Sequence, residues 1–212
     1  MSIRLPDAAG ATRVVLVRHA ETDVSARGQC YGQLDVALSS TGRAQAHALA
    51  QALRVVPLAA IYTSPLVRAL DTARPIAAEH GVEPLIHRGL LELDFGELEG
   101  VSYDTIAAER PDLYRRWMEM PASVRFPGGE CLAELRDRVM AAVAEIRGRH
   151  GGDAVAIVSH GGVLRIVLAD ALGLDDEALF RIDQPYGAVS VVDWVEQVAL
   201  VRAINLFLYS AA

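Results

Sequence analysis

Four consecutive apolar residues, followed at once by a cation and an imidazole, constrain this chain more than any other feature. Residues 14–17 (Val-Val-Leu-Val) predict a strand that is buried on both faces, and Arg18 and His19 stand where that strand should end. In open α/β sheets, ligands bind in the crevice outside the carboxyl ends of the strands, because residues there reach a ligand without disrupting the core. This stretch therefore predicts an α/β fold with a functional site at Arg18 and His19.

A second buried strand with the same ending occurs late in the chain. Residues 154–158 (Ala-Val-Ala-Ile-Val) lead through Ser159 to His160 and Gly161. One histidine after a buried strand is a weak indication of a site, but two histidines after separate strands are a much stronger one. We expect His160 to belong to the same site, with Gly161 allowing a helix to begin against it. The loop at 184–187, ahead of two closing strands at 189–195 and 198–206, is expected at the rim.

Composition is typical of a globular protein with one core. With 212 residues, 52% of them hydrophobic and 22% charged, we expect a single domain over 1–212 that begins with a loose arm at 1–12. No apolar run reaches the roughly 18 residues that a membrane span needs, and the first residues do not resemble a signal peptide. We therefore expect a cytoplasmic protein with no membrane partner. The formal net charge of −7 argues against a nucleic-acid partner.

Neither the cysteines nor the histidines show the spacing of a metal site. Cys30 and Cys131 belong to no CxxC pair, and the six histidines form neither an HxH nor an HExxH pattern. We therefore expect no metal, no cofactor and no structural disulfide.

An arginine early in a helix is the next candidate for the site. Ser40 or Thr41 is expected to cap a first helix, and Ser64 with Pro65 is expected to begin a second one. Arg68 then lies in the first turn of that second helix. Because a cation is stabilised at the opposite end of a helix, this position suits an anion that Arg68 shares with backbone amides.

A carboxylate among leucines precedes an aromatic segment. Glu92 is flanked by Leu90, Leu91 and Leu93. Apolar surroundings favour the protonated form of a carboxyl group, which suits a proton donor. Residues 101–128 carry tyrosines, a tryptophan, methionines and a phenylalanine among prolines. We expect a lid-like insertion over the crevice, although a packed satellite core would show the same composition.

These motifs resemble those of the histidine phosphatase superfamily, which includes phosphoglycerate mutases and many phosphatases. The similar stretches run in order along the chain: Arg18-His19-Ala20, where the family has Arg-His-Gly; residues 27–46; residues 64–73 (SPLVRALDTA); residues 90–100, with the family's Leu-x-Glu-x-x-x-Gly-x-x-x-Gly pattern; and residues 154–165. The resemblance implies a phosphoglycerate mutase-like α/β fold. Such a fold is a three-layer sandwich in which helices flank a mostly parallel central sheet, with an insertion over the active site.

The resemblance also implies a role for each candidate residue. His19 would be the nucleophile that takes the phosphoryl group, and Glu92 would give a proton to the leaving oxygen and later take one from water. The phosphoryl oxygens would be held by Arg18, Arg68 and His160. The substrate-binding residues would be Ser25, where relatives often have asparagine, Tyr31, Gly32, Gln33 and Gly161. Elementary chemistry agrees, since two arginines and an imidazolium supply the cations that phosphoryl transfer needs without a metal.

The expected activity is hydrolysis of a small phosphate ester through a phosphohistidine on His19. Residues 30–35 (CYGQLD) look most like the members that dephosphorylate α-ribazole phosphate. Two alternatives stay open. One is phosphoglycerate mutase-type transfer, which the short stretch between Glu92 and His160 disfavours. The other is a non-catalytic phosphoester-binding module, which would have no need of Glu92.

Two other classes of hydrolase fit the sequence poorly. A cysteine phosphatase is excluded because neither cysteine is followed six positions later by arginine. A serine hydrolase is disfavoured because the segment around Ser159 lacks the first glycine of GxSxG. The partner expected is therefore a small-molecule phosphate ester, and a homodimer is compatible with the sequence.

Overall fold

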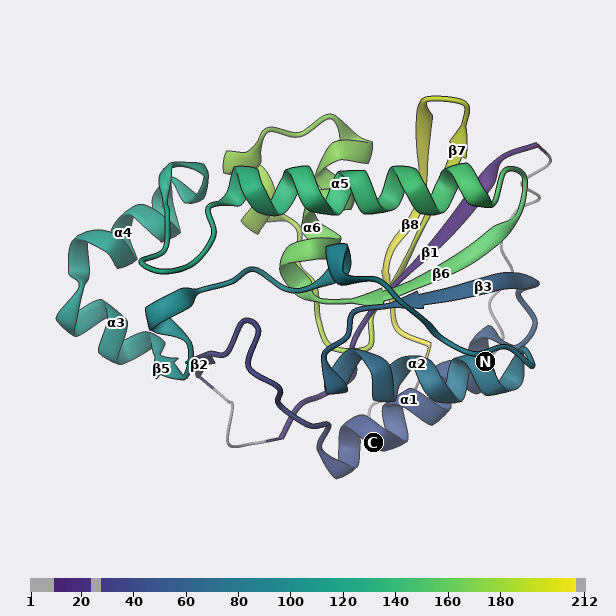
Figure 1. The fold of residues 1–212 in the computed structure, drawn as a ribbon, viewed down its shortest axis with the longest axis horizontal. Helices are drawn as coiled ribbons and strands as arrows, with labels where there is room; N and C mark the ends of the chain where they lie inside the picture. Colours follow the sequence, from purple (N-terminus) through teal and green to yellow (C-terminus); the bar gives the residue numbers. More distant parts are fainter. Residues whose placement is uncertain (1–9, 24–27, 209–212) are drawn as a thin grey trace.

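A six-stranded sheet forms the centre of the computed structural model, which describes residues 10–23 and 28–208 (Figure 1). In sheet order the strands are β4 (Leu85–Ile86), β3 (Leu58–Thr63), β6 (Ala154–Ser159), β1 (Thr12–Arg18), β7 (Val189–Val195) and β8 (Val198–Leu206). The first four are parallel, while β7 and β8 are antiparallel to their neighbours. The mostly parallel sheet and its two closing strands are thus confirmed.

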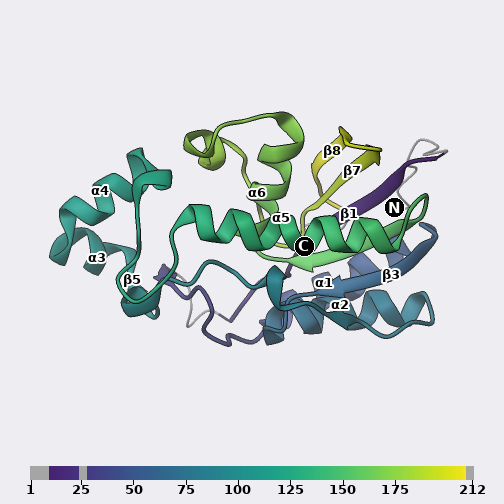
Figure 2. The ribbon, with the colours of Figure 1, turned by 45° about the horizontal axis from the view of Figure 1, so that its top comes forward.

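Helices cover both faces of the sheet and complete three layers. One face carries α1 (Ser40–Leu53) and α2 (Val67–Glu79), and the other carries α5 (Leu132–Arg149) and α6 (Gly161–Leu172) (Figure 1). Beyond one end of the sheet lie α3 (Tyr103–Glu109) and α4 (Pro111–Glu119), as both views show (Figure 2). The connections contain a small sheet of β2 (Gln29–Cys30) with β5 (Val101–Ser102), and the short 3₁₀ helices η2 (Arg88–Leu90), η3 (Gly96–Leu98), η4 (Pro121–Ser123) and η5 (Asp176–Arg181).

The first strand is buried on both faces, as its sequence predicts. Val14 and Leu16 belong to one core cluster, whereas Val15 and Val17 belong to the other, and all four side chains are fully buried. Burying one such side chain stabilises the fold by about 1.5–3 kcal/mol. The position of β1 is therefore strongly determined, and with it the point at which Arg18 leaves the sheet.

Strands β1 and β6 end side by side. Arg18 is paired with Ser159 in the parallel register, and the backbone N–H of His19 donates to the carbonyl oxygen of Ser159 at 2.8 Å. The next residues, His19 and His160, consequently leave adjacent strands, and their ring centroids are 5.2 Å apart. The expectation that both histidines occupy one place is confirmed.

The start of α1 differs from the prediction by one residue. Its N-cap is Ser39 rather than Ser40 or Thr41, and the Ser39 hydroxyl oxygen accepts from the backbone N–H of Gly42 at 2.9 Å. The same hydroxyl donates to Glu21 Oε1 at 2.8 Å, a contact from outside the helix that local sequence does not reveal.

The start of α2 also differs. The helix begins at Val67 with Leu66 as N-cap, whereas Ser64 and Pro65 lie before it. Ser64 does not cap the helix because its hydroxyl lies 2.7 Å from Nε2 of His160. Ser64, predicted to begin the helix, thus hydrogen-bonds to His160 instead.

Two further predictions concern the N-terminal arm and membrane-spanning helices. Of the arm predicted at 1–12, residue 12 already belongs to β1 and residues 1–9 lie outside the described part of the chain. Among the described helices, none combines the length and the apolar character needed to cross a membrane.

Candidate active site

A cavity of about 330 Å³ lies where β1 and β6 end. Six of the predicted site residues line it: Arg18, His19, Tyr31, Gly32, Glu92 and Gly161. Arg68 and His160 are fully buried next to it rather than in its wall. Gln33 is not part of the wall either, and its side-chain amide donates to the carbonyl oxygen of Glu92 at 3.0 Å. Ser25 lies outside the described residues.

The protonation of His19 follows from its surroundings. Its Nδ1 lies 2.9 Å from the carbonyl oxygen of Ala20, and because a carbonyl oxygen only accepts, Nδ1 must carry the proton. Burial, followed by the charges of Arg18 and Arg68, holds the pKa of His19 well below its ordinary value. The ring is therefore neutral, and Nε2 keeps a free lone pair.

Arg18 reaches the cavity directly from the end of β1. Its Nη1 donates to the carbonyl oxygen of Gln184, and its guanidinium lies 4.2 Å from the centroid of the Tyr186 ring. The Tyr186 ring centroid is also 5.4 Å from that of His19. The loop at 184–187 thus contacts both residues of the Arg-His pair, as expected for the rim.

Arg68 lies in the first turn of α2, as predicted, and is fully buried. Its Nη1 and Nη2 donate to the carbonyl oxygens of Leu34 at 2.7 Å and Gly32 at 2.5 Å. Burial lowers the pKa of this guanidinium. Its Cζ lies 4.9 Å from the centroid of Tyr31, whose hydroxyl is 3.0 Å from that of Tyr186. The two tyrosines therefore join the loops that cover the two arginines.

His160 is neutral in this structure, which corrects the expectation of an imidazolium. Burial, followed by the charges of Arg68, His19 and Arg18, holds the pKa of His160 well below its ordinary value. The ring can still donate a hydrogen bond. Ser64 Oγ accepts from the backbone N–H of Leu66 at 3.4 Å, so its hydroxyl hydrogen remains for Nε2 of His160. Nδ1 of the neutral ring then carries a proton.

Three buried nitrogens beside His19 have no hydrogen-bond partner within residues 10–23 and 28–208. They are Nε of Arg18, Nε of Arg68 and Nδ1 of His160. Buried polar atoms in native proteins are nearly always paired, because an unmade hydrogen bond costs roughly 1–3 kcal/mol. Three unpaired donors around one imidazole indicate a place for an anion with several oxygens.

Glu92 lines the same cavity as His19. Its Oε1 accepts from the backbone N–H of Leu93 at 2.9 Å, and its Oε2 accepts from that of Gly162 at 3.1 Å. A Cβ on Gly162 would lie 2.3 Å from Glu92 Oε1, so any larger residue there would displace the Glu92 carboxylate. The predicted apolar surroundings are only partly present, since Leu90 is turned into the core and two backbone amides solvate the carboxylate.

Most of the remaining wall of the cavity is apolar, and half of its apolar residues are aromatic. It is formed by Leu93, Phe95, Tyr103, Trp117, Pro121, Phe126, Leu132, Leu135, Leu179 and Phe180. Trp117 and Phe126 pack edge to face, with ring centroids 5.2 Å apart, and both belong to the main core cluster. Segment 101–128 thus contributes to the core and to the cavity at the same time.

Comparisons with known proteins agree with this geometry. The sequence pattern of the Histidine phosphatase superfamily (branch 1) matches residues 14–206. The chain belongs to this superfamily. Phosphoserine phosphatase 1 of Hydrogenobacter thermophilus is 34% identical to it over 194 residues, which are 92% of each chain. The Metal-independent phosphoserine phosphatase of Arabidopsis thaliana is 37% identical over 159 residues, 74% of this chain and 67% of that protein.

Solved structures of similar proteins extend the comparison. The crystal structure of the alpha-ribazole phosphatase from Shigella flexneri superposes with a TM-score of 0.83 at 27% identity, covering 92% of this chain and 96% of that one. The chain is therefore a phosphatase of the histidine phosphatase superfamily, and its substrate class is a phosphate ester.

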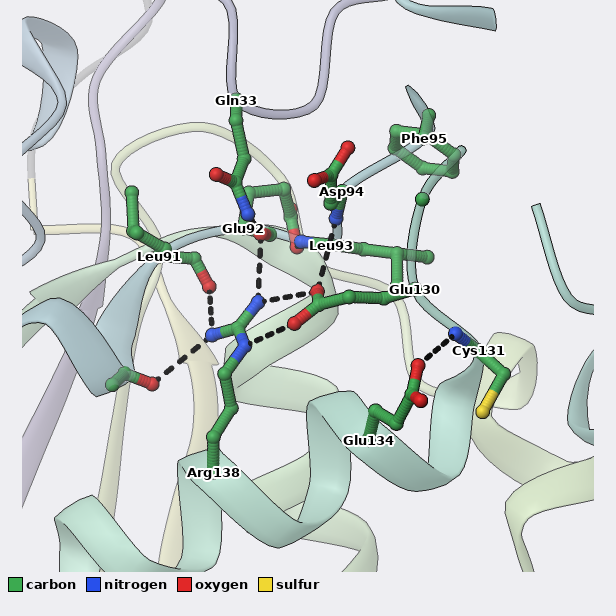
Figure 3. Close-up of polar contacts among 12 residues, drawn as sticks. Gln33, Leu91, Glu92, Leu93, Asp94, Phe95, Glu130, Cys131, Glu134 and Arg138 are labelled. Atoms are coloured by element: carbon green, nitrogen blue, oxygen red, sulfur yellow. Dashed lines mark hydrogen bonds and ion pairs between the residues drawn. The ribbon is translucent and has the colours of Figure 1, made fainter. Parts of the chain in front are cut away.

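The phosphatase also contains two arginines, one beside the site and one in its wall, that sequence reasoning missed. Arg138 of α5 donates to the backbone of the Glu92 segment and to Glu130 (Figure 3). Arg165 of α6 lines the cavity, and its Nη1 would lie 3.1 Å from a Cβ on Gly161. Nothing local distinguishes these two arginines from those on a solvated helix face, so their roles depend on contacts between distant parts of the chain.

Proposed function

We propose that this phosphatase hydrolyses a small phosphorylated metabolite in two transfers, with a phosphohistidine on His19 between them. The observation that carries the proposal is the set of three unpaired nitrogens, from Arg18, Arg68 and His160, around a neutral imidazole. A phosphoryl group in transfer spreads its charge over three equatorial oxygens. The number and kind of donors match those oxygens, and binding would satisfy each buried nitrogen.

In the first transfer, the lone pair on Nε2 of His19 forms a bond to phosphorus while the bond from phosphorus to the ester oxygen breaks. Glu92, entering this step protonated, gives its proton to the departing alkoxide, so a neutral alcohol leaves. The phosphorylated ring carries a positive charge because Nδ1 keeps its proton. The Ala20 carbonyl oxygen, 2.9 Å from Nδ1, stabilises that charge.

In the second transfer, water attacks the phosphorus of the phosphohistidine. The Glu92 carboxylate takes a proton from this water, the bond from phosphorus to Nε2 breaks, and inorganic phosphate leaves. Both residues return to their starting protonation states. Splitting hydrolysis in this way replaces one difficult displacement by two easier ones.

For the substrate, we propose α-ribazole phosphate. Segment 30–35 motivates this choice, and the aromatic wall supports it, because rings such as Phe95 and Phe180 suit an aromatic base on the leaving group. The alpha-ribazole phosphatase from Shigella flexneri is one of the similar structures. Catalytic efficiency on α-ribazole phosphate should exceed that on phosphoserine, phosphoglycerates and sugar phosphates. Equal efficiency on phosphoserine would reject the assignment, and isomerisation of phosphoglycerate with little phosphate release would indicate a mutase.

Glu92→Gln tests the mechanism. The amide keeps the size and polarity of the side chain but neither gives nor takes a proton, and such help is worth about 10²–10⁴ in rate. Nitrophenolate leaves without a proton, whereas an alkoxide does not. The variant should release a burst of nitrophenol about equal to the enzyme present, then turn over slowly with phosphate held on His19.

A matched control is Glu97→Gln, which changes an exposed carboxylate in the same segment and should behave as the unmodified phosphatase does. Loss of the burst in Glu92→Gln, with equally slow reaction of nitrophenyl and alkyl esters, would show that Glu92 is not the proton donor.

A further inference from the structure

We infer that Arg138 and Glu130 are positioning residues that hold Glu92 at the distance needed for proton transfer. The inference rests on the acid and base role of Glu92 proposed above. Arg138 comes from α5 and Glu130 from the segment just before that helix (Figure 3). Neither residue lines the cavity, so neither is a catalytic residue.

Arg138 uses all five of its N–H donors on this segment. Nη1 donates to the carbonyl oxygens of Leu91 at 2.6 Å and Gly89 at 3.1 Å. Nη2 donates to the carbonyl oxygen of Glu92 at 2.8 Å. The remaining donors bind Glu130, Nε to Oε1 at 2.7 Å and Nη2 to Oε2 at 2.8 Å. A planar guanidinium presents its donors in a fixed fork, which a lysine ammonium with three donors does not reproduce.

The backbone that carries Glu92 depends on these contacts because it is mostly irregular. After η2 ends at Leu90, the chain has no helix or strand until η3 begins at Gly96. Carbonyl oxygens in this stretch therefore accept hydrogen bonds from side chains instead of from the backbone N–H groups of a helix or sheet. The carbonyl oxygen of Leu90 accepts from the hydroxyl of Ser159 at 2.8 Å, and that of Glu92 also accepts from Gln33.

Glu130 holds the backbone on the C-terminal side of Glu92. Its Oε2 accepts from the backbone N–H of Asp94 at 3.1 Å, and its own N–H donates to the carbonyl oxygen of Asp94 at 2.9 Å. The backbone is thus fixed on both sides of Glu92 by one ion pair, in which both side chains are about four-fifths buried. Only the side-chain torsions of Glu92 remain to be set, and the N–H groups of Leu93 and Gly162 set those.

Proton transfer needs this precision. A general acid must lie about 2.6–3.2 Å from the atom that it serves, and a misplacement of about 1 Å can cost 10²-fold in rate. Since Arg138 contacts the Glu92 carbonyl and not its carboxylate, loss of Arg138 should harm the steps that use the Glu92 proton and spare the attack by His19.

Arg138→Lys and Glu130→Gln test the inference. In Arg138→Lys, turnover of an alkyl phosphate should fall by about 10²-fold. The nitrophenol burst should keep an amplitude near one per enzyme. Glu130→Gln keeps the contacts of Arg138 with the carbonyl oxygens and should show the same pattern more weakly. Because burst amplitude counts competent sites, an unfolded fraction is separated from a misplaced Glu92.

The matched control is Arg147→Lys at the far end of the same helix. Arg147 is half-buried, donates to the carbonyl oxygen of Glu196 at 2.7 Å and lies 4.7 Å from the centroid of Trp194, away from the cavity. This variant loses similar contacts and should leave the ratio of first-transfer rates on alkyl and nitrophenyl esters unchanged. A ratio that changes as much in Arg147→Lys as in Arg138→Lys would overturn the inference.

A double variant completes the test. If Arg138 acts through Glu92, adding Arg138→Lys to Glu92→Gln should cost little further activity, because residues that act as a unit are not additive. Additive losses, or an equal loss in the rate of the first transfer on both esters, would show that Arg138 only supports the fold and would overturn the inference. A Glu92→Gln single variant whose first transfer is equally slow on both esters would instead reject the proposed role of Glu92 itself.

Discussion

The two sides of the cavity are built by different means. The cationic side comes from the ends of β1 and β6 and from the first turn of α2, all fixed by the central sheet. The aromatic side comes mostly from connections, namely residues 93–95, segment 101–128 and η5, with Leu132 and Leu135 from the start of α5. The difference separates two properties. In the proposed mechanism, the fold places the groups that act on phosphorus, whereas the connections determine which leaving group fits.

Two rings of the aromatic side are much more exposed than His19 of the cationic side, although Trp117 and Phe126 are buried. His19 is 2% exposed, whereas Tyr103 and Phe180 on the aromatic side are 38% and 49% exposed. The buried side presents polar atoms without partners, and the aromatic side presents rings with uncovered faces. A phosphate ester that bridges the two sides would satisfy both, with its phosphoryl group on one and its alcohol on the other.

The largest expected effect is on the cationic side. His19→Ala removes the only proposed nucleophile, so turnover should fall by several orders of magnitude on every ester, whatever its leaving group. No nitrophenol burst should remain. The control is His47→Ala, which changes an exposed histidine on α1. A burst that survives His19→Ala would transfer the nucleophilic role to another residue, with His160 the first to examine.

A smaller and selective effect is expected on the aromatic side. Phe180→Ala removes a half-exposed ring, so the fold should tolerate it. An aromatic contact contributes about 0.5–1.5 kcal/mol beyond area burial, so KM for esters of aromatic or nucleoside alcohols should rise about 10-fold. KM for small aliphatic esters and kcat for both classes should not change. An equal rise of KM for both classes would mean that this side does not select the leaving group.

The histidines and Arg68 of the cationic side could be predicted from the sequence, whereas the role of Arg138 could not. The runs that end in His19 and His160 are local patterns, and burial on both faces of the sheet leaves few other places for them. Arg68 is found in the same way, from its place in a helix. In contrast, Arg138 and Arg147 are both arginines of α5, and contacts with segment 89–94 distinguish Arg138 only in the folded chain.

Predictions that depend on competition between distant groups are the ones that differ from the structure. Ser64 resembles a helix cap, but its hydroxyl binds His160, a residue far along the chain. The neutral state of His160 likewise results from burial and from arginines of other segments. Local pattern predicts where a side chain leaves the backbone, whereas its partner and its charge are set by the tertiary fold.

The two buried histidines should make stability depend on pH. Both have pKa values below the 6.5 of an unfolded chain, so below about pH 6.5 the unfolded state binds protons that the folded state does not. The free energy of unfolding should therefore fall as pH falls below about 6.5. Urea denaturation at several pH values measures this slope. His160→Gln should reduce it, and the exposed-site control His47→Gln should not. An unchanged slope in His160→Gln would contradict the buried neutral state.

The smallest expected effect is that of a chelator, which should leave turnover unchanged. The reason is that side chains on the cationic side carry the positive charge that a metal ion would otherwise bring. In the proposed mechanism, Arg18 and Arg68 bring two cations to the phosphoryl oxygens and His160 adds a neutral donor, so the developing charge can be stabilised without a Lewis acid. Within the described residues, no group of three or more histidine, cysteine or acidic side chains is arranged to hold a metal ion.

The measurement compares initial rates before and after dialysis against EDTA, and again after zinc or magnesium is restored. Equal rates in all three conditions are expected on both nitrophenyl and alkyl esters. The alkyl ester makes the test demanding, because its transition state places the most charge on the leaving oxygen, where the proton of Glu92 has to substitute for a metal. A loss on the alkyl ester alone, restored by the ion, would mean that Glu92 does not suffice at the leaving oxygen. A loss on both esters would mean that the arginines do not suffice at phosphorus.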